Sequence, residues 1–538
     1  MKVIDLFCGG GGFSEGFERA GFEIVKAYDI WTTAVITHNQ NHGNGKNVAE
    51  RKDIFEISMM EDEEFEKYIP DTEIIIGSPP CIAFSNSNKS GKADKTEGVK
   101  LIEAFLRIVA RKQKKTGSTL KYWLMENVVN SSKYLKDSYD AKDLNWPELE
   151  GFVLNIPNKS VYNMKDFGVP TNRKRFVAGN YIKPLLNNTE SEKTLKDIQN
   201  HLGKPNPNLY IQNNKLLKDP IYGFEMNSKD ITDHHYIKEI PKFEWEKAKR
   251  QKLDKGYMGK MSFPENVNKP SRTIMATLSS QSRESMIFGM ENENERYRYP
   301  TIREVATLMS FPIDFRFYGE SDSIKYKLIG NAVAPKFAYE LAVLIRENLN
   351  IDSSVDKFKR KKEFNEQIPF KNLNGIVFPL KKEKPRKFQT RFSYHIPYLI
   401  INSFRVTLEN EFKDKDQVKW KVKIDYSQGK NARVYENIFV DISNFTIQEL
   451  TEMRKILIKL KKDISSAKEL QLNYCTISDE RLGFGPEELL NQVKSFLIDS
   501  IEDERLVEIP DIEKSIPKQI LAGYYILQTI TKEMYDNG

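Results

Sequence analysis

The chain has 538 residues, of which 39% are hydrophobic and 30% are charged, which is enough apolar material for cores in about two to four domains. Its formal net charge of +7 allows nucleic-acid binding without requiring it. Three dispersed cysteines argue against a disulfide framework, no run of about 18 apolar residues predicts a membrane span, and the six histidines show no metal-ligand spacing. We therefore expect a soluble, cytoplasmic protein without a bound metal.

The predicted elements begin with a strand at residues 2–7, a loop with four successive glycines at 8–14, and a helix at 15–20. Glycines let the backbone approach a ligand closely, and the amino end of a helix favours polar or anionic groups. Because many kinds of nucleotide-binding protein share such a loop, the loop predicts a nucleotide-like ligand without identifying it.

Acidic residues follow the next two predicted strands. Asp29 ends the apolar run at residues 23–28, where a carboxylate suits the two hydroxyls of a ribose. Asp53 follows a third candidate strand and could accept a hydrogen bond from the amino group of an adenine. The alternative for both acids is ordinary capping at a strand end, and taken alone the two interpretations have similar weight.

A cysteine in a Pro-Pro turn follows the next strand. Residues 73–77 form an apolar run, which Pro79 and Pro80 end abruptly because proline donates no hydrogen bond to a sheet. Cys81 is thereby placed at the carboxyl edge of the sheet, where open α/β folds bind their ligands. The alternative is a small buried hydrophobic residue, as most lone cysteines are.

A helix predicted at residues 98–115 leads into a strand at 122–125, which brings Glu126 to the same edge as Cys81. Residues 1–182 therefore alternate strands and helices, the pattern of a doubly wound α/β sheet. Residues 183–297 are less regular and rich in Asn, Lys and Pro.

The remainder of the chain divides into a basic stretch and a folded tail. The basic stretch, with lysines and arginines between residues 357 and 387, is either a solvated linker or an arm that follows DNA. In the tail, residues 418–424 alternate as a strand with one exposed face, and residues 450–460 and 489–498 have the pattern of amphipathic helices.

Six segments in this order resemble the motifs of the cytosine carbon-5 DNA methyltransferase family. They are DLFCGGGGF (5–13), GSPPCIAFS (77–85), MENV (125–128), GVPTNRKRF (168–176), TIREVATLMSFP (301–312) and YKLIGNAVAP (326–335). The resemblance covers residues 1 to about 182 and about 270 to 347. The chain departs from the family pattern at Ile82 and Thr171, where glutamine is usual, at Met309-Ser310, where Gln-Gly is usual, and at Ala334, which replaces a common proline. None of these changes removes a reacting group.

The resemblance implies an α/β fold of the S-adenosylmethionine-dependent methyltransferases, a Rossmann-like doubly wound sheet with an inserted target-recognition domain and an additional α+β C-terminal domain. We expect the domains to be a catalytic domain at 1–182 and 300–349, a target-recognition domain at 183–299, a basic linker at 350–388 and the C-terminal domain at 389–538.

The resemblance also implies S-adenosylmethionine as the cofactor. The expected cofactor site joins the glycine loop, the strand-end acids and their neighbours, with Asn331 at the amino-acid end of the cofactor. Of the two aromatic residues in this set, Phe13 is the better candidate because it adjoins the glycines. The expected site residues are Asp5, Phe7, Gly9, Gly11, Phe13, Asp29, Ile30, Asp53, Ile54, Pro80 and Asn331.

The implied reaction is methylation of cytosine at carbon 5, with Cys81, Glu126, Arg173 and Arg175 as the catalytic residues. Carbon 5 is a poor nucleophile, and addition of a thiolate at carbon 6 makes it enamine-like. Glu126 would hydrogen-bond or protonate ring nitrogen 3 and read the exocyclic amine, and Arg175 would donate to the ring carbonyl. Arg173 would fix Glu126 or a phosphate.

Double-stranded DNA is the implied partner, because a cytosine inside a duplex must be flipped out to be reached. Ser85, Arg272 and Arg283 are candidate DNA contacts, and plain solvated surface is the alternative for the two arginines. We expect a nucleoid-associated enzyme of a restriction-modification or phage-defence system, with a cognate endonuclease. The alternatives are an RNA cytosine methyltransferase, a non-catalytic DNA-binding subunit, and a fused modification-restriction protein with a nuclease tail.

Overall fold

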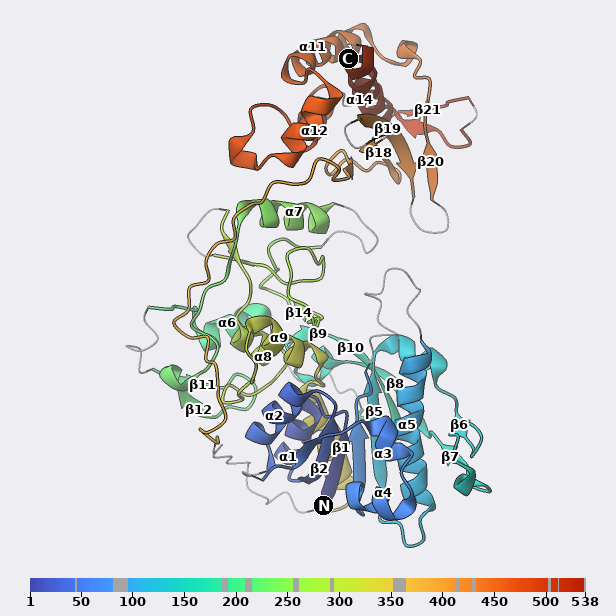
Figure 1. The fold of residues 1–538 in the computed structure, drawn as a ribbon, viewed down its shortest axis with the longest axis vertical. Coiled ribbons are helices and arrows are strands. Elements are labelled where there is room, and N and C mark those ends of the chain that lie inside the picture. The colour runs from blue at the N-terminus through green and yellow to red at the C-terminus, as the bar shows by residue number, and fades with distance from the viewer. Residues whose placement is uncertain are drawn as a thin grey trace. The chain divides into compact units, whose positions relative to one another are not determined.

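The computed structural model describes most of the chain and divides it into two compact units (Figure 1). The described residues are 1–43, 46–80, 95–185, 192–208, 215–254, 261–290, 295–351, 364–412, 414, 417–427, 432–501, 505–510 and 512–536. The first unit comprises residues 1–240 and 264–380, and the second comprises residues 241–263 and 381–538. Residues 241–263 therefore group with the tail, and residues 364–380 group with the N-terminal part of the chain.

A seven-stranded sheet forms the centre of the first unit, in the order β3-β2-β1-β4-β5-β10-β8. The first five strands of this order are parallel, and β10 pairs antiparallel with both β5 and β8. The bounds are β1 (Lys2–Leu6), β2 (Glu23–Asp29), β3 (Ala49–Arg51), β4 (Ile74–Gly77), β5 (Tyr122–Asn127), β8 (Asn158–Asn163) and β10 (Lys174–Asn180). The predicted α/β class is confirmed.

Helices cover both faces of this sheet because its buried strands are apolar on both sides. Along β4, Ile74 and Ile76 belong to one hydrophobic core, and Ile75 belongs to another. The first core includes α1 (Gly12–Arg19) and α10 (Pro335–Asn348), and the second includes α3 (Ile54–Ser58) and α5 (Thr96–Lys114) (Figure 1). The first unit is thus a three-layer α/β/α sandwich.

Shorter elements complete the first unit. The helices are α2 (Thr32–Asn41), α4 (Asp62–Tyr68), α6 (Leu195–Leu202), α8 (Ile302–Leu308) and α9 (Asp322–Asn331). The strands are β6 (Ser138–Tyr139), β7 (Leu154–Asn155), β9 (Thr171–Asn172), β11 (Leu216–Lys218), β12 (Glu225–Asn227), β13 (Glu239–Ile240), β14 (Ser271–Arg272), β15 (Phe288–Gly289) and β16 (Tyr297–Arg298). The parallel pairing of β9 with β14 ties the arginine motif at 168–176 to residues 271–272.

Residues 364–380 are integrated into the first unit through polar contacts. The Asn372 side chain accepts a hydrogen bond from the Asp233 amide at 3.0 Å, and the Asn374 side chain accepts from the amides of His234 and His235 at 2.9 and 2.8 Å. Asp233 also forms a fully buried ion pair with Lys325 at 2.7 Å. The His-His pair therefore lies in a buried turn, and this part of the basic stretch is not a free linker.

The second unit is α+β and has its own core. Its sheet is antiparallel in the order β17-β18-β19-β20, with β17 (Ser393–His395), β18 (Phe404–Phe412), β19 (Val418–Tyr426) and β20 (Arg433–Tyr435). The remaining elements are α7 (Lys242–Leu253), α11 (Ile447–Asp463), α12 (Ala467–Cys475), α13 (Pro486–Ser500), β21 (Leu506–Val507), β22 (Ile516–Pro517) and α14 (Lys518–Asp536). The predicted strand at 418–424 and the two predicted helices are confirmed.

Contacts with β17 and the loop after it hold the 241–263 segment in the second unit. Arg250 donates to the carbonyl of His395 at 2.6 Å and lies 4.7 Å from the centre of the Tyr394 ring. Asp254 accepts from the amide of Tyr398. Helix α7 is therefore part of the C-terminal fold.

One stretch in the described part of the chain is long and apolar enough to cross a membrane, Asp322–Asn348. It carries α9 and α10, and 67% of its most apolar window is buried inside the first unit. This stretch is therefore a core element of the fold.

Candidate active site

The glycine loop between β1 and α1 needs its glycines for close packing. Gly9 and Gly11 have φ values of +53° and +93°, which side chains rarely adopt. A Cβ atom at Gly11 would lie 2.2 Å from Nε2 of His42, and one at Gly12 would lie 2.2 Å from the carbonyl oxygen of Val333. The loop is thereby pressed between α2 and the segment that precedes α10.

Asp29 ties the glycine loop to the end of β2. Its Oδ2 accepts from the Gly9 amide at 2.9 Å, and its Oδ1 accepts from the Trp31 amide at 2.8 Å. Burial raises the pKa of Asp29, while these amide hydrogen bonds lower it. The neighbouring Ile30 is 62% exposed, so the strand end presents both an acid and an apolar side chain.

Asp53 and Ile54 start α3, and the structure shows local roles for both. The Asp53 carboxylate caps the helix by accepting from the Phe55 amide at 2.8 Å, which is the capping alternative that the sequence left open. Ile54 is buried in the hydrophobic core that includes α3 and α5. Binding of a cofactor by either side chain stays a prediction.

Asp5 at the carboxyl end of β1 is buried beneath the glycine loop. Its Oδ2 accepts from the Ser14 hydroxyl at 2.6 Å, and Ser14 is in turn 2.9 Å from Nε2 of His38. Burial raises the pKa of Asp5 to about 7. Its Oδ1 is also buried and accepts no hydrogen bond from the described residues.

The two aromatic candidates beside this loop differ in exposure. Phe13, the better candidate by sequence, is 3% exposed and packs against Phe17 in the hydrophobic core at a ring distance of 5.7 Å. Phe7 is half-buried and has a positive φ of 59°. Phe7 is therefore the ring with surface to offer a ligand.

Glu126 lies at the carboxyl end of β5 and is 4% exposed. Its Oε2 accepts a hydrogen bond from the Ser78 hydroxyl at 2.7 Å. Its Oε1 forms an ion pair with Nε of Arg175 at 3.1 Å and has no hydrogen bond from the described residues. The structure therefore brings two of the predicted catalytic residues together.

Ser78 is a functional candidate that the sequence reasoning did not single out. The signal was the strand register, because Gly77 pairs with Met125 and the next residues, Ser78 and Glu126, are then neighbours. The adjoining Asn127 donates to the carbonyl of Pro79 at 3.1 Å. The Pro-Pro turn is thus fastened directly to the strand that carries Glu126.

The predicted residues Cys81, Ile82 and Ser85 lie outside the described part of the chain. Pro80, the described residue before Cys81, is exposed at the end of the turn. Cys8, by contrast, is buried, and burial raises its pKa well above the usual thiol value, which disfavours a reactive thiolate there.

Arg173 is 1% exposed, although sequence placed it beside Arg175 in the reacting set. Its guanidinium donates to the carbonyls of Ile274, Gly330 and Ala332 at 2.8, 3.0 and 3.2 Å. It therefore holds the chain on both sides of Asn331, which is itself exposed. These contacts favour a positioning role for Arg173 in place of the expected contact with Glu126 or a phosphate.

The two arginines predicted to bind DNA are both half-buried. Arg272 donates to Glu265 at 2.9 Å, so its charge is already partly neutralised. Burial lowers the pKa of Arg283. The expectation that they contact DNA stays a prediction, with weaker support for Arg272 than the sequence alone suggested.

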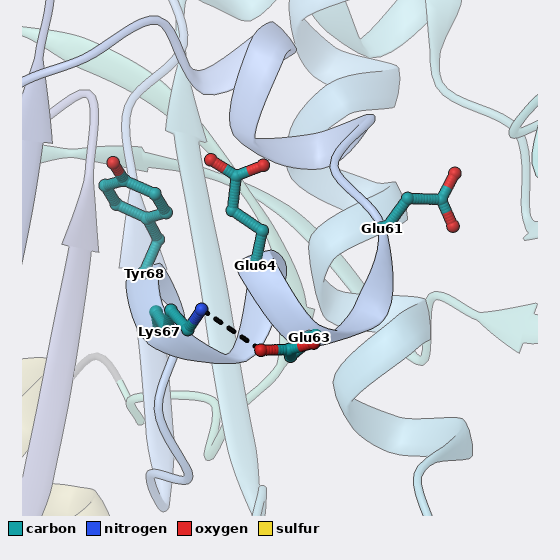
Figure 2. Close-up of a pocket in the computed structure, with 5 residues that line it drawn as sticks. All are labelled: Glu61, Glu63, Glu64, Lys67 and Tyr68. Carbon is teal, nitrogen blue, oxygen red and sulfur yellow. Dashed lines mark hydrogen bonds and ion pairs between the residues drawn. The ribbon is translucent and has the colours of Figure 1, made fainter.

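Two other clusters of polar residues lie away from Glu126. A surface hollow at α4 is lined by Glu61, Glu63, Glu64, Lys67 and Tyr68, with Lys67 paired to Glu63 at 3.3 Å (Figure 2). Its acidic lining would repel phosphates.

Glu15, Glu18 and His42 are the described residues whose types and spacing suit a metal ion. His42 pairs with Glu18 at 2.8 Å and Arg19 with Glu15 at 2.8 Å, so these groups already satisfy one another.

Comparison with known proteins agrees with this arrangement. The sequence model of the family described as C-5 cytosine-specific DNA methylase matches residues 1–347. The chain is similar to the type II methyltransferase M.FnuDI of Fusobacterium nucleatum, with 29% identity over 69% of this chain and 100% of that protein. It is also similar to the type II methyltransferase M.MthTI of Methanothermobacter thermautotrophicus, with 29% identity over 65% and 98%.

Among solved structures, the S. pombe Dnmt2 methyltransferase aligns with a TM-score of 0.43 at 18% identity over 65% of this chain and 99% of that one. The family match covers most of the first unit, including the glycine loop, Glu126 and the arginine motif. The chain therefore belongs to the C-5 cytosine-specific DNA methylase family and is a DNA (cytosine-5-)-methyltransferase.

Proposed function

We propose that this enzyme transfers a methyl group from S-adenosylmethionine to carbon 5 of a flipped-out cytosine, through a covalent adduct with Cys81. The observation that carries the proposal is the cluster of Ser78, Glu126 and Arg175, fastened by Asn127 to the turn that leads into Cys81. Two polar groups that can bind a pyrimidine ring thus adjoin the chain position of the soft nucleophile.

The residues at the neighbouring strand ends fit the cofactor. Asp5 has a buried carboxylate oxygen that accepts no hydrogen bond from the described residues, which suits an ammonium group, and Asp29 adjoins the exposed side chain of Ile30. Asn331 is exposed beside the carbonyls held by Arg173. When bound, S-adenosylmethionine supplies an electrophilic methyl group.

The protein's part in the reaction follows from its side chains. The Cys81 thiolate adds to carbon 6, and the electron pair moves through the ring to carbon 5, where the methyl group is accepted. Glu126 hydrogen-bonds ring nitrogen 3 and takes up the charge that develops there, while Arg175 donates to the ring carbonyl. Loss of the carbon-5 proton to water and expulsion of Cys81 then restore the aromatic ring.

Ser78 acts on this step through Glu126. Because its hydroxyl donates to Oε2, the other oxygen, Oε1, is the one left for a proton or a hydrogen bond to the base. Ser78 is therefore proposed as a positioning residue, and Arg173 as a second one that holds the segment around Asn331.

We further propose that residues 183–299 contain the part that reads the DNA sequence, and that the enzyme acts near the nucleoid in a restriction-modification or defence system with a cognate endonuclease. The type II methyltransferase names of its relatives support this setting.

The test is bisulfite or direct-read sequencing of DNA from cells that express this chain alone. Methylation of cytosines at one short motif is the expected result. Unmethylated DNA, together with methyl transfer from labelled cofactor to RNA, would overturn DNA as the substrate. No transfer to either polymer by purified enzyme would overturn the reaction itself.

A further inference from the structure

Lysines 382, 384 and 387 form an exposed strip on the second unit, called here the lysine strip. None of the three ammonium groups has an ion pair or hydrogen bond with the described residues, and all three side chains are exposed. Residues 381–387 lie in no helix or strand, and a turn follows at residues 388–389. The sequence left this segment open as either a solvated linker or an arm that follows DNA.

The residues between these lysines are anchored to the fold. Glu383 accepts from the amide and hydroxyl of Ser478 at 3.0 and 2.9 Å. Arg386 donates to the carbonyl of Tyr474 at 2.7 Å, and its own amide donates to Cys475 at 2.8 Å. The strip is therefore fixed to the end of α12, and its lysines are displayed from a held backbone.

The start of the strip is also fastened. Lys381 pairs with Glu244 of α7 at 3.0 Å, so the strip begins against a helix of the same unit. The thiol of Cys475 donates to the carbonyl of Lys387 at its other end. These contacts distinguish the strip from a mobile linker, whose lysines would lose more conformational freedom on binding.

Other lysines of the same unit are neutralised within the protein. On the exposed face of the sheet, Lys423 pairs with Glu409 at 2.5 Å, and Lys421 pairs with Glu411. On α11, Lys455 pairs with Glu452 at 2.6 Å. The charge of the lysine strip is, by contrast, uncompensated by the described residues, which leaves it available to an anionic partner.

We propose that the lysine strip binds the phosphate backbone of the duplex DNA that the enzyme methylates, outside the residues that read sequence. This inference rests on DNA being the substrate. Six extended residues span at most about 20 Å, which corresponds to about six phosphates along one strand at 3.4 Å each. Three lysines can therefore each meet a phosphate, and the contact would be independent of sequence.

The test compares two triple variants of the full chain by fluorescence anisotropy with a 30-base-pair unmethylated duplex, between 50 and 200 mM salt. K382Q/K384Q/K387Q removes the strip. K421Q/K423Q/K455Q removes the same charge from lysines that are already paired.

The strip variant should bind more weakly, and the slope of log affinity against log salt should fall by about 2.7, or 0.9 for each lost phosphate contact. The ratio of the wild-type affinity to that of the strip variant should accordingly fall about 40-fold from 50 to 200 mM salt. The paired-lysine variant should keep the wild-type slope. Thermal melting of all three proteins verifies that they fold.

Two results would overturn the proposal. One is an unchanged slope for the strip variant, and the other is an equal loss in both variants, which would show only an effect of net charge. Methyl transfer measured on the same samples separates this from the proposed function, because an active enzyme with an unchanged slope disproves the strip alone. A folded wild-type enzyme that methylates no DNA would disprove the reaction whatever the slopes show.

Discussion

Carboxylates at the sheet edge of the first unit are buried, whereas those on the sheet face of the second unit meet solvent and lysines. Asp5 and Glu126 lie at strand ends among hydroxyls and an arginine. Glu409 and Glu411 lie within β18, each opposite a lysine of β19. Buried acids at one edge are costly to keep and can act on a ligand, while cross-strand pairs on an open face mainly keep that face soluble.

This contrast indicates where chemistry should be sought in this chain. The first unit concentrates polar groups at the carboxyl ends of parallel strands, and the second distributes them in compensated pairs. Four variants test this contrast, and three of them have a counterpart in the other unit.

Replacement of Cys81 by serine should have the largest effect. A hydroxyl is a much poorer nucleophile than a thiolate, so methyl transfer should fall by about 10⁴-fold or more, while DNA binding is largely retained. Incorporation of labelled methyl groups measures methyl transfer, and fluorescence anisotropy measures DNA binding. Cys475→Ser, in the second unit, should leave turnover near wild type. Substantial turnover by Cys81→Ser would exclude the covalent adduct.

Glu126→Gln should lower turnover by about 10²- to 10⁴-fold, because the amide cannot supply the proton or take up the charge at ring nitrogen 3. The matched change Glu411→Gln in the second unit breaks an exposed pair and should not alter turnover. Single-turnover kinetics separate this effect from binding. A wild-type rate for Glu126→Gln would remove this residue from the acid role.

Asp5→Asn should change how stability depends on pH. Because burial raises the pKa of Asp5 from 3.8 to about 7, its folded form holds a proton that the unfolded form has lost, and stability falls as pH rises from about 4 to about 7. The asparagine variant lacks this loss of unfolding free energy, which amounts to at most about 4 kcal/mol. It should therefore be stabilised relative to the wild type at pH 8 but not at pH 4.

Denaturant unfolding at the two pH values measures this difference, and parallel pH profiles for wild type and variant would contradict it. The contribution of Glu411 to stability changes with pH in the opposite direction. Its hydrogen bond with Lys421 lowers its pKa, so its contribution is present above the unfolded pKa and is lost as pH falls. The two units should thus respond to pH in opposite directions at these residues.

Ser78→Ala should have the smallest effect, about tenfold in turnover, because it removes one hydrogen bond to a carboxylate. The loss should appear in kcat with little change in KM or in melting temperature. Ser78→Thr keeps the hydroxyl and should restore part of the rate. Ser393→Ala, which removes a 3.3 Å contact to Glu409, is the counterpart. Equal rates for Ser78→Ala and wild type would leave Glu126 positioned by its strand alone.

The sequence predicted most of the layout of the first unit because local signals agreed with tertiary ones. The apolar run that contains Ile74, Ile75 and Ile76 serves two cores, and the Pro-Pro turn ends the strand where expected. Glu126 and Arg175 could also be placed together, since they lie on adjacent strands.

Other features could not be predicted because they depend on contacts distant in sequence. Arg173 and Arg175 are two residues apart in one motif, yet one donates to carbonyls more than 100 residues away and the other meets Glu126. Residues 241–263 carry no local sign that they pack on β17. The partners of Asp233, which are Asn372 and Lys325, are likewise far away in the sequence.

The chain passes between the two units three times, after residues 240, 263 and 380. No single truncation can therefore remove the second unit, because a chain ending at 380 would still carry α7, whose Arg250 would lose its contacts with Tyr394 and His395. Because the α7 excursion and the C-terminal extension fold as one unit, we expect them to have been acquired together. A relative that lacks the extension should also lack the excursion. Comparison of homologous sequences at the positions of residues 241–263 and 381–538 can establish whether the two are inherited together.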